Sequence, residues 1–133
     1  MEIKSKLYLV DASGEKFMGI GVLWLLKRVG ETGSLRAAAA AMDISYSKAY
    51  KMVGALERQL GVDVVVRRKG GSLHEGSSLT EFGRKFADLY DGFQQEAKVQ
   101  LVEPFERFSV RLEVLLEEFH REEQQHGRSE QGR

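Results

Sequence analysis

The hydrophobic and polar positions of residues 34–61 predict two short helices joined by a tight turn. Residues 35–42 contain five alanines, which favour a helix and let a second helix cross closely because their side chains are small. Asp43 and Ser45 favour a break, since their short polar side chains hydrogen-bond to nearby backbone. Ser34 is placed to cap the first helix and Ser45 the second. This arrangement is typical of a helix-turn-helix.

The second helix, from Tyr46, is predicted to be amphipathic because its apolar residues recur every three or four positions. Its core face consists of Ala49, Val53, Leu56 and Leu60. The opposite face carries hydroxyl and cationic side chains near the helix N-terminus: Tyr46, Ser47, Lys48, Tyr50 and Lys51. In helix-turn-helix proteins this part enters the DNA major groove. Gly61 is expected to end the helix in a left-handed conformation. A helix pair with a merely solvated outer face is the alternative.

The segment after Gly61 favours the DNA-binding interpretation. Residues 62–66 form a β-branched run, and residues 77–80 can return as a second strand after the diglycine Gly70-Gly71. A hairpin directly after a helix-turn-helix is a wing. Its cations, which could reach phosphates or the adjacent minor groove, are Arg67, Arg68 and Lys69. A cationic hairpin tip by itself would more often be a solvated loop.

Two further elements are predicted before the helix-turn-helix. Residues 6–10 and 15–18 are expected to form a hairpin around a glycine-containing turn. Apolar residues between 22 and 29 then predict a helix that packs under the other two and ends at Gly30. Trp24 is expected in this core or at its edge, rather than in a stacking role.

The C-terminal part predicts helices with apolar stripes. Thr80 can cap a helix, Gly83 permits close approach by a neighbour, and Pro104 predicts a bend or a new helix. The stripes consist of Phe82, Phe86, Leu89, Phe93, Phe105, Phe108, Leu112, Leu115 and Phe119. Their spacing of three and four is that of heptads, and the remaining sequence offers little to cover them. We therefore expect them to form a dimer interface, with folding back onto the same domain as the alternative. Residues 122–133 are expected to be disordered.

Charge and composition refine this picture. The 133 residues carry 20 Lys/Arg and 20 Asp/Glu, so the net charge is zero. Residues 1–79 nevertheless hold 12 cations against 8 anions, and residues 80–133 hold 8 against 12. The positive charge thus lies where the groove-facing elements are predicted. No apolar run is long enough to span a bilayer and no signal peptide is apparent, so we expect a cytoplasmic protein without membrane contact.

The sequence offers no constellation typical of an enzyme or a metal site. It lacks cysteine, and His74, His120 and His126 do not have the spacing of a helical metal pair. Gly70-Gly71 is too short for a nucleotide-binding loop and does not lead into a helix. We therefore expect no catalytic residues, no metal and no cofactor.

From Leu7 to about Ala97 the chain resembles the N-terminal winged helix domain of ModE-type molybdate-responsive transcriptional regulators, which is similar to the DNA-binding domain of LysR-type regulators. The resemblance rests on the sequence motifs at residues 31–35, 44–50 and 79–83, the alanine-rich helix and the diglycine of the wing. It implies a homodimer on a palindromic operator, with residues 45–51 in the major groove. Molybdate sensing in the family uses C-terminal modules that we do not find in this sequence. The sequence therefore does not support molybdate or another small molecule as an effector.

Together these observations predict a mainly α protein with small β elements, a winged helix-turn-helix with an N-terminal β-hairpin and a long C-terminal dimerisation helix. We expect a DNA-binding domain over residues 1–80, a helical dimerisation extension over 81–121 and a disordered tail over 122–133. The expected function is sequence-specific binding of double-stranded DNA as a homodimeric transcriptional regulator. A winged-helix module for protein interaction or heterodimerisation is the alternative. The predicted DNA contacts are Ser34, Arg36, Ser45, Tyr46, Ser47, Lys48, Tyr50, Lys51, Arg67, Arg68 and Lys69.

Overall fold

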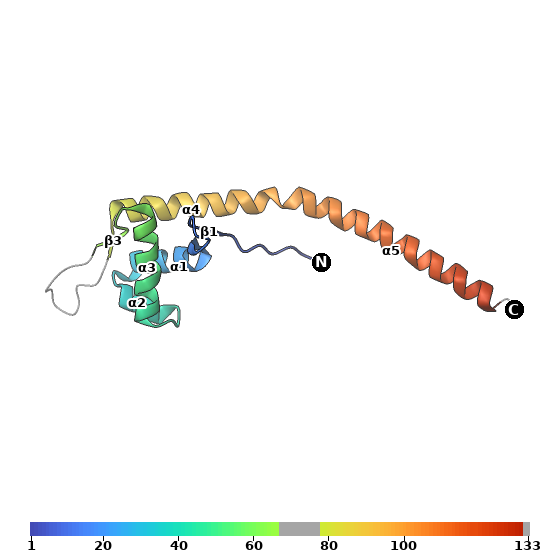
Figure 1. Ribbon diagram of the computed structural model, residues 1–133, viewed down its shortest axis with the longest axis horizontal. Coiled ribbons are helices and arrows are strands. Elements are labelled where there is room, and N and C mark those ends of the chain that lie inside the picture. The colour runs from blue at the N-terminus through green and yellow to red at the C-terminus, as the bar shows by residue number, and fades with distance from the viewer. Residues whose placement is uncertain (67–77, 132–133) are drawn as a thin grey trace. The chain divides into compact units, whose positions relative to one another are not determined.

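The computed structural model describes residues 1–66 and 78–131, with side chains to residue 127, and its fold is mainly helical with two small hairpins (Figure 1). The elements are β1 (Tyr8–Val10), β2 (Lys16–Gly19), α1 (Ile20–Thr32), α2 (Leu35–Ala41), α3 (Tyr46–Leu60), β3 (Val65–Val66), β4 (Ser78–Leu79), α4 (Glu81–Gln100) and α5 (Val102–Gln131). The chain divides into two compact units. One comprises Lys4–Gln95, and the other comprises Met1–Ile3 and Glu96–Arg133.

The N-terminal hairpin is present as predicted. β1 and β2 pair antiparallel, with Leu9 opposite Met18, and a bulge follows Leu9. The Asp11 carboxylate organises the turn, since it accepts hydrogen bonds from the Ser13 hydroxyl at 2.7 Å and the Glu15 N–H at 3.0 Å. These bonds, that of the Ser13 side chain first, lower the pKa of Asp11 because they stabilise the ionised carboxylate.

The core of the Lys4–Gln95 unit forms where α1, α2 and α3 pack together. Its largest fully buried side chains are Met18, Leu23, Leu25, Leu26, Leu35, Leu56, Val29, Val53 and Val64. Ala38, Ala39 and Ala49 are also buried, which allows α2 and α3 to approach closely. The predicted core face of α3 is confirmed at Ala49, Val53 and Leu56, whereas Leu60 is only half-buried.

One expectation for α1 is narrowed and another is wrong. Trp24 was expected in the core or at its edge, and the core is excluded because the residue is 55% exposed. The buried positions of α1 are occupied by smaller aliphatic residues on the opposite side of the helix. Gly30 does not end α1, which continues to Thr32; Gly33 ends it with φ 73° and donates its N–H to the Val29 carbonyl at 2.8 Å. A glycine tolerates this left-handed conformation without a steric penalty, whereas Gly30 faces Leu79 within the helix.

The start of α4 is held against the segment before β3. The Thr80 hydroxyl accepts the N–H of Gly83 and donates to the Asp63 carbonyl, both at 2.8 Å. The predicted cap at Thr80 is thereby confirmed. Gly83 is confirmed as a point of close approach, because a Cβ there would lie 2.2 Å from the Val64 carbonyl oxygen.

The first part of α4 belongs to the Lys4–Gln95 unit, so this unit extends beyond the expected boundary at residue 80. Ala87, Tyr90 and Gln94 are buried on α4 and account for the difference. Helical periodicity alone does not indicate which face of such a helix its own domain covers.

The second unit contains the end of α4 and all of α5. The helix breaks at Leu101 and a new one begins at Val102, which confirms the prediction made from Pro104. Pro104 lies in the first turn of α5, where its missing N–H costs no intrahelical hydrogen bond. α5 continues to Gln131, through most of the segment that we expected to be disordered, and residues 121–125 all have high helix propensity. Among the described residues, no helix is long and apolar enough to cross a membrane.

Candidate nucleic-acid interface

The helix-turn-helix is built as its capping residues predict. Ser34 accepts the N–H of Ala37 at 3.2 Å to cap α2, and Ser45 accepts the N–H of Lys48 at 3.0 Å to cap α3. Asp43 has φ 56°, and the N–H of Ile44 reaches the Ala39 carbonyl at 3.0 Å. Aspartate is one of the few residues that enter the left-handed region readily. The turn therefore fixes the direction in which α3 leaves α2.

The predicted groove-facing residues share one exposed surface. Tyr46, Ser47, Lys48, Tyr50 and Lys51 are all exposed on the first two turns of α3, away from its buried stripe. The rings of Tyr46 and Tyr50 lie 6.2 Å apart, so they form an aromatic edge beside the two lysines. The cap at Gly61, with φ 70°, ends the helix as expected. We call this surface the α3 N-terminal face.

Arg36 of α2 extends the α3 N-terminal face across the turn. Its guanidinium carbon lies 4.5 Å from the centroid of the Tyr46 ring. Arg36 is exposed, and Ser34 is half-buried beside it. The structure thus brings Arg36 from one helix onto a residue at the start of the other, a contact that sequence spacing did not reveal.

The base of the wing is present, because β3 and β4 pair antiparallel with Val65 opposite Leu79. Glu57 of α3 accepts the backbone N–H of Val64 at 2.8 Å and of Val65 at 3.4 Å. This anchor ties the C-terminal half of α3 to β3, and the sequence analysis missed it. The predicted wing contacts Arg67, Arg68 and Lys69, together with His74, lie outside the described residues.

The predicted dimer residues on α4 differ in burial. Phe82, Phe86, Tyr90 and Phe93 follow one another as a ladder of rings 5.9–6.3 Å apart. Phe86 is half-buried and packs against the core of its own unit. Phe82, Leu89 and Phe93 are exposed, Leu89 most of all at 74%, so these three remain open to a partner.

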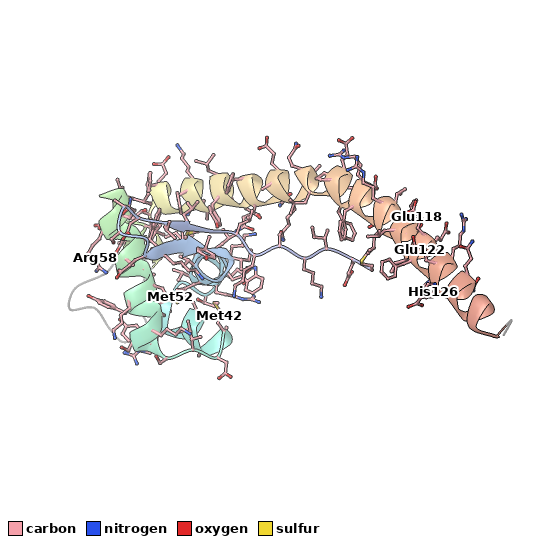
Figure 2. All side chains as sticks on the ribbon, turned by 45° about the vertical axis from the view of Figure 1, so that its right-hand side comes forward. Met42, Met52, Arg58, Glu118, Glu122 and His126 are labelled. Carbon is pink, nitrogen blue, oxygen red and sulfur yellow. The ribbon has the colours of Figure 1, made fainter. Side chains whose placement is uncertain are left out.

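The apolar stripe of α5 is largely open. Phe108, Leu115 and Phe119 are exposed, whereas Phe105 and Leu112 are half-buried within their unit. Val110, Val114 and Leu116 are exposed on other sides of α5. Figure 2 shows Glu118, Glu122 and His126 along the C-terminal part of this helix. No group of metal-binding side chains was found among the described residues.

The described residues of the Lys4–Gln95 unit also line surface hollows, two of which lie beside α1. The first, of about 330 Å³, lies beside β2 and the turn, and Met42 and Met52 line it (Figure 2). The second, of about 430 Å³, is lined by Trp24, Lys27 and Arg28. Lys27 pairs with Asp91 at 2.8 Å and Arg28 with Glu31 at 2.9 Å, so the cations of this hollow are already neutralised.

Residues 22–84 match the model of a protein family described as bacterial regulatory helix-turn-helix protein, lysR family. The matched segment begins within α1 and ends in the first turn of α4. It therefore contains α2, the turn, α3 and the base of the wing, which are the elements that build the surface described above.

Among curated proteins, the chain is similar to the molybdenum-pterin-binding protein MopB of Rhodobacter capsulatus. The two are 34% identical over 90 residues, which cover 68% of this chain and 33% of the relative. It is also similar to the molybdenum transport protein ModE of Azotobacter vinelandii, with 30% identity over 88 residues, 66% of this chain and 31% of the relative. The chain spans about a third of the length of these relatives.

Among solved structures, the chain is similar to the DNA-binding domain of CbnR in complex with DNA. The TM-score is 0.51 at 28% identity, and the match covers 62% of this chain and 90% of that chain. Full-length CbnR with its target DNA matches with the same TM-score and identity, over 62% of this chain and 27% of that chain.

Proposed function

Because residues 22–84 form a helix-turn-helix DNA-binding domain of the lysR family, we propose that the chain binds double-stranded DNA sequence-specifically as a homodimer and regulates transcription in the cytoplasm. The predicted resemblance to LysR-type and ModE-type DNA-binding domains is confirmed. The family consists of regulators and not of enzymes, in agreement with the prediction that the chain is not an enzyme.

The single observation that carries the proposal is the α3 N-terminal face. Ser45 caps the first turn of α3. The buried stripe of α3 packs against the core, so the opposite side of the helix faces solvent. The exposed hydroxyls and lysines there match what DNA offers, because phosphates attract cations and base edges accept and donate hydrogen bonds. Residues 44–74 carry six cations against two anions, although the whole chain is neutral.

The likeness to CbnR supports the same interaction, since that protein's domain of similar fold is described in complex with DNA. In the proposed complex, residues 45–51 enter the major groove and Lys48 or Lys51 reaches phosphates. The wing cations Arg67, Arg68 and Lys69 would contact the flanking backbone.

Homodimerisation through α5 would place two α3 helices on one DNA duplex. The exposed residues Phe108, Leu115 and Phe119 repeat at spacings of seven and four, so they lie along one side of α5. A second copy of the chain could cover this stripe as in a coiled coil. The two half-sites would then be centred about 34 Å apart, or a multiple of that distance.

Measuring the affinity for duplex DNA across a salt series tests the proposal. Each phosphate neutralised by a Lys or Arg releases counterions, so log K should fall linearly with log salt at a slope of about −0.9 per contact. An excess of random-sequence duplex should compete weakly against a duplex selected by the protein. A slope near zero, or equal competition by random DNA, would contradict sequence-specific DNA binding.

A heterodimerising module is the second candidate, and the exposed stripe of α5 is the observation that favours it. Such a chain would pair with a longer relative instead of with itself. Sedimentation of the purified chain distinguishes the two candidates, because a homodimer forms as the protein concentration rises. A chain that stays monomeric at every concentration and binds DNA only weakly would favour the heterodimeric role.

A further inference from the structure

Arg36, which contacts Tyr46, occupies a position at which a cation does not stabilise its own helix. Arg36 is the second residue of α2, directly after the Ser34 cap and Leu35, and the first turn of α2 contains no acidic residue. A cation is unfavourable at this end of a helix, because the unsatisfied N–H groups give it a partial positive charge. Arg36 forms no ion pair with any described carboxylate that could offset this effect.

The Tyr46 ring instead determines where the guanidinium lies. The guanidinium carbon is 4.5 Å from the ring centroid, within the range of a cation–π interaction. This contact holds the guanidinium over the ring and restricts the side chain, while the N–H donors lie in the plane of the group. Tyr46 is the first residue of α3 and is itself exposed, so the stacked arginine lies at the N-terminal end of this helix.

We infer that Arg36, held by Tyr46, reads a guanine in the major groove. This inference rests on the proposed DNA binding and adds the chemical identity of one recognised base. Two guanidinium N–H groups would donate to guanine O6 and N7, the pair of acceptors that only guanine presents in this groove. Arg36 is the specificity-determining residue of the contact, and Tyr46 is its positioning residue.

A phosphate contact would not require this geometry. A phosphate contact carries no sequence information, and the exposed lysines Lys48 and Lys51 on the same face can supply it as point charges. A guanidinium held in place by a ring is suited to the planar edge of a base, because less side-chain freedom is lost when its two donors bind. In a homodimer the contact occurs once in each half-site, so the operator would contain two symmetry-related guanines.

Selection of DNA from a random library identifies the operator and tests the inference. The wild type should enrich sites with an invariant guanine in each half. In Arg36→Ala and Arg36→Lys, the preference for guanine over the other bases should fall by about 5- to 150-fold at that position of the operator and at no other. Arg58→Ala is the matched control, because Arg58 is exposed at the other end of α3 (Figure 2). This variant should still enrich sites that contain the guanine.

Replacing that guanine by 7-deazaguanine removes N7 and leaves the base pair intact. Wild-type affinity should fall about 10-fold, because a hydrogen bond from a charged donor is lost, and binding by Arg36→Ala should not change. Tyr46→Phe keeps the ring and should retain the 7-deazaguanine effect, whereas Tyr46→Leu should lose it. Thermal unfolding of each variant confirms that it is folded.

The outcomes separate the two proposals. If the wild type enriches sites but Arg36→Ala keeps every preference, or if both proteins respond equally to 7-deazaguanine, the guanine contact is wrong and DNA binding stands. If Arg36→Ala weakens binding to all duplexes equally and keeps the guanine preference, the side chain contacts a phosphate and the inference is again wrong. If the wild type enriches nothing and its affinity is independent of salt, both proposals fail.

Discussion

The carboxylate of Glu57 accepts a hydrogen bond from the backbone N–H of Val64 at 2.8 Å and thereby fastens α3 to the first strand of the wing. A backbone N–H that lies partly buried at the end of a helix needs such a partner. The same carboxylate oxygen lies 3.4 Å from the N–H of Val65. One side chain of the proposed recognition helix therefore also holds the start of β3.

Removing this anchor should destabilise the Lys4–Gln95 unit. For Glu57→Ala we expect a loss of about 1–3 kcal/mol in the free energy of unfolding, because the N–H of Val64 is left without its acceptor. Glu57→Gln retains an uncharged acceptor and should lose less. Urea titrations of both variants measure the difference. Equal stability of Glu57→Ala and the wild type would mean that the bond contributes nothing.

Gly83 should tolerate no side chain. The Cβ of Gly83→Ala would lie 2.2 Å from the Val64 carbonyl oxygen, so either α4 or the segment before β3 must move. We expect a loss of about 1–3 kcal/mol or more in stability, measured by urea titration. The matched control is Gly92→Ala on the same helix, where a Cβ meets no atom within 4 Å. This control should raise stability by about 0.5–1 kcal/mol, because alanine favours the helix; similar effects of both changes would contradict the close approach.

Tyr90 and Gln94 form a buried polar pair on α4. The Gln94 amide donates to the Tyr90 hydroxyl at 2.7 Å, and both side chains are buried. Tyr90→Phe should cost about 1–3 kcal/mol in unfolding free energy, because it leaves the buried amide without its acceptor.

The double variant Tyr90→Phe/Gln94→Met tests this explanation. It removes both polar groups and should be more stable than Tyr90→Phe alone, since no amide remains unsatisfied. Thermal or urea unfolding of the single and double variants gives the coupling between the two side chains. Additive losses would show that packing, and not the hydrogen bond, determines their effect.

The local features of the helix-turn-helix could be predicted from the sequence because each depends on its neighbours along the chain. Ser34, Ser45 and Gly61 cap helices through bonds to residues three or four positions away, and the structure confirms all three. Thr80 combines a local cap with a bond to Asp63, and only the cap was foreseeable.

The missed features depend on how elements pack. The apolar residues around Trp24 indicate a buried helix but not which of its faces α2 and α3 cover, so the exposure of Trp24 was not foreseeable. The partner of Glu57 is a backbone group beyond the end of α3, and such a group leaves no pattern in the sequence. Arg36 and Tyr46 meet because of the angle between α2 and α3, which sequence spacing does not determine.

Lysine and hydroxyl side chains on the α3 N-terminal face should affect DNA binding differently. Lys51→Ala should weaken binding to all duplexes by about 1 kcal/mol or more and reduce the salt slope by about one contact, because it removes a proposed phosphate partner. Ser47→Ala should change the preferred sequence and leave the salt slope unaltered. Fluorescence anisotropy with selected and random duplexes measures both effects. Unchanged binding by both variants would mean that another surface contacts DNA.

A charged residue introduced on the apolar stripe of α5 should dissociate the proposed dimer into monomers. Leu115 is 55% exposed and lies on the heptad stripe, so Leu115→Glu would place a carboxylate in the contact with a second copy. We expect a chain that sediments as a monomer at concentrations at which the wild type is a dimer. Its affinity for a palindromic duplex should fall toward that for a single half-site, because the two α3 helices no longer act together.

Val110→Glu is the matched control for this prediction. Val110 is 60% exposed on the same helix but off the stripe of Phe108, Leu112 and Leu115, so the substitution adds the same charge outside the proposed contact. This variant should remain a dimer and keep the wild-type affinity for the palindrome. If both variants dissociate, more than one side of α5 contacts the partner, whereas a dimer that persists in Leu115→Glu means that the stripe is not the interface.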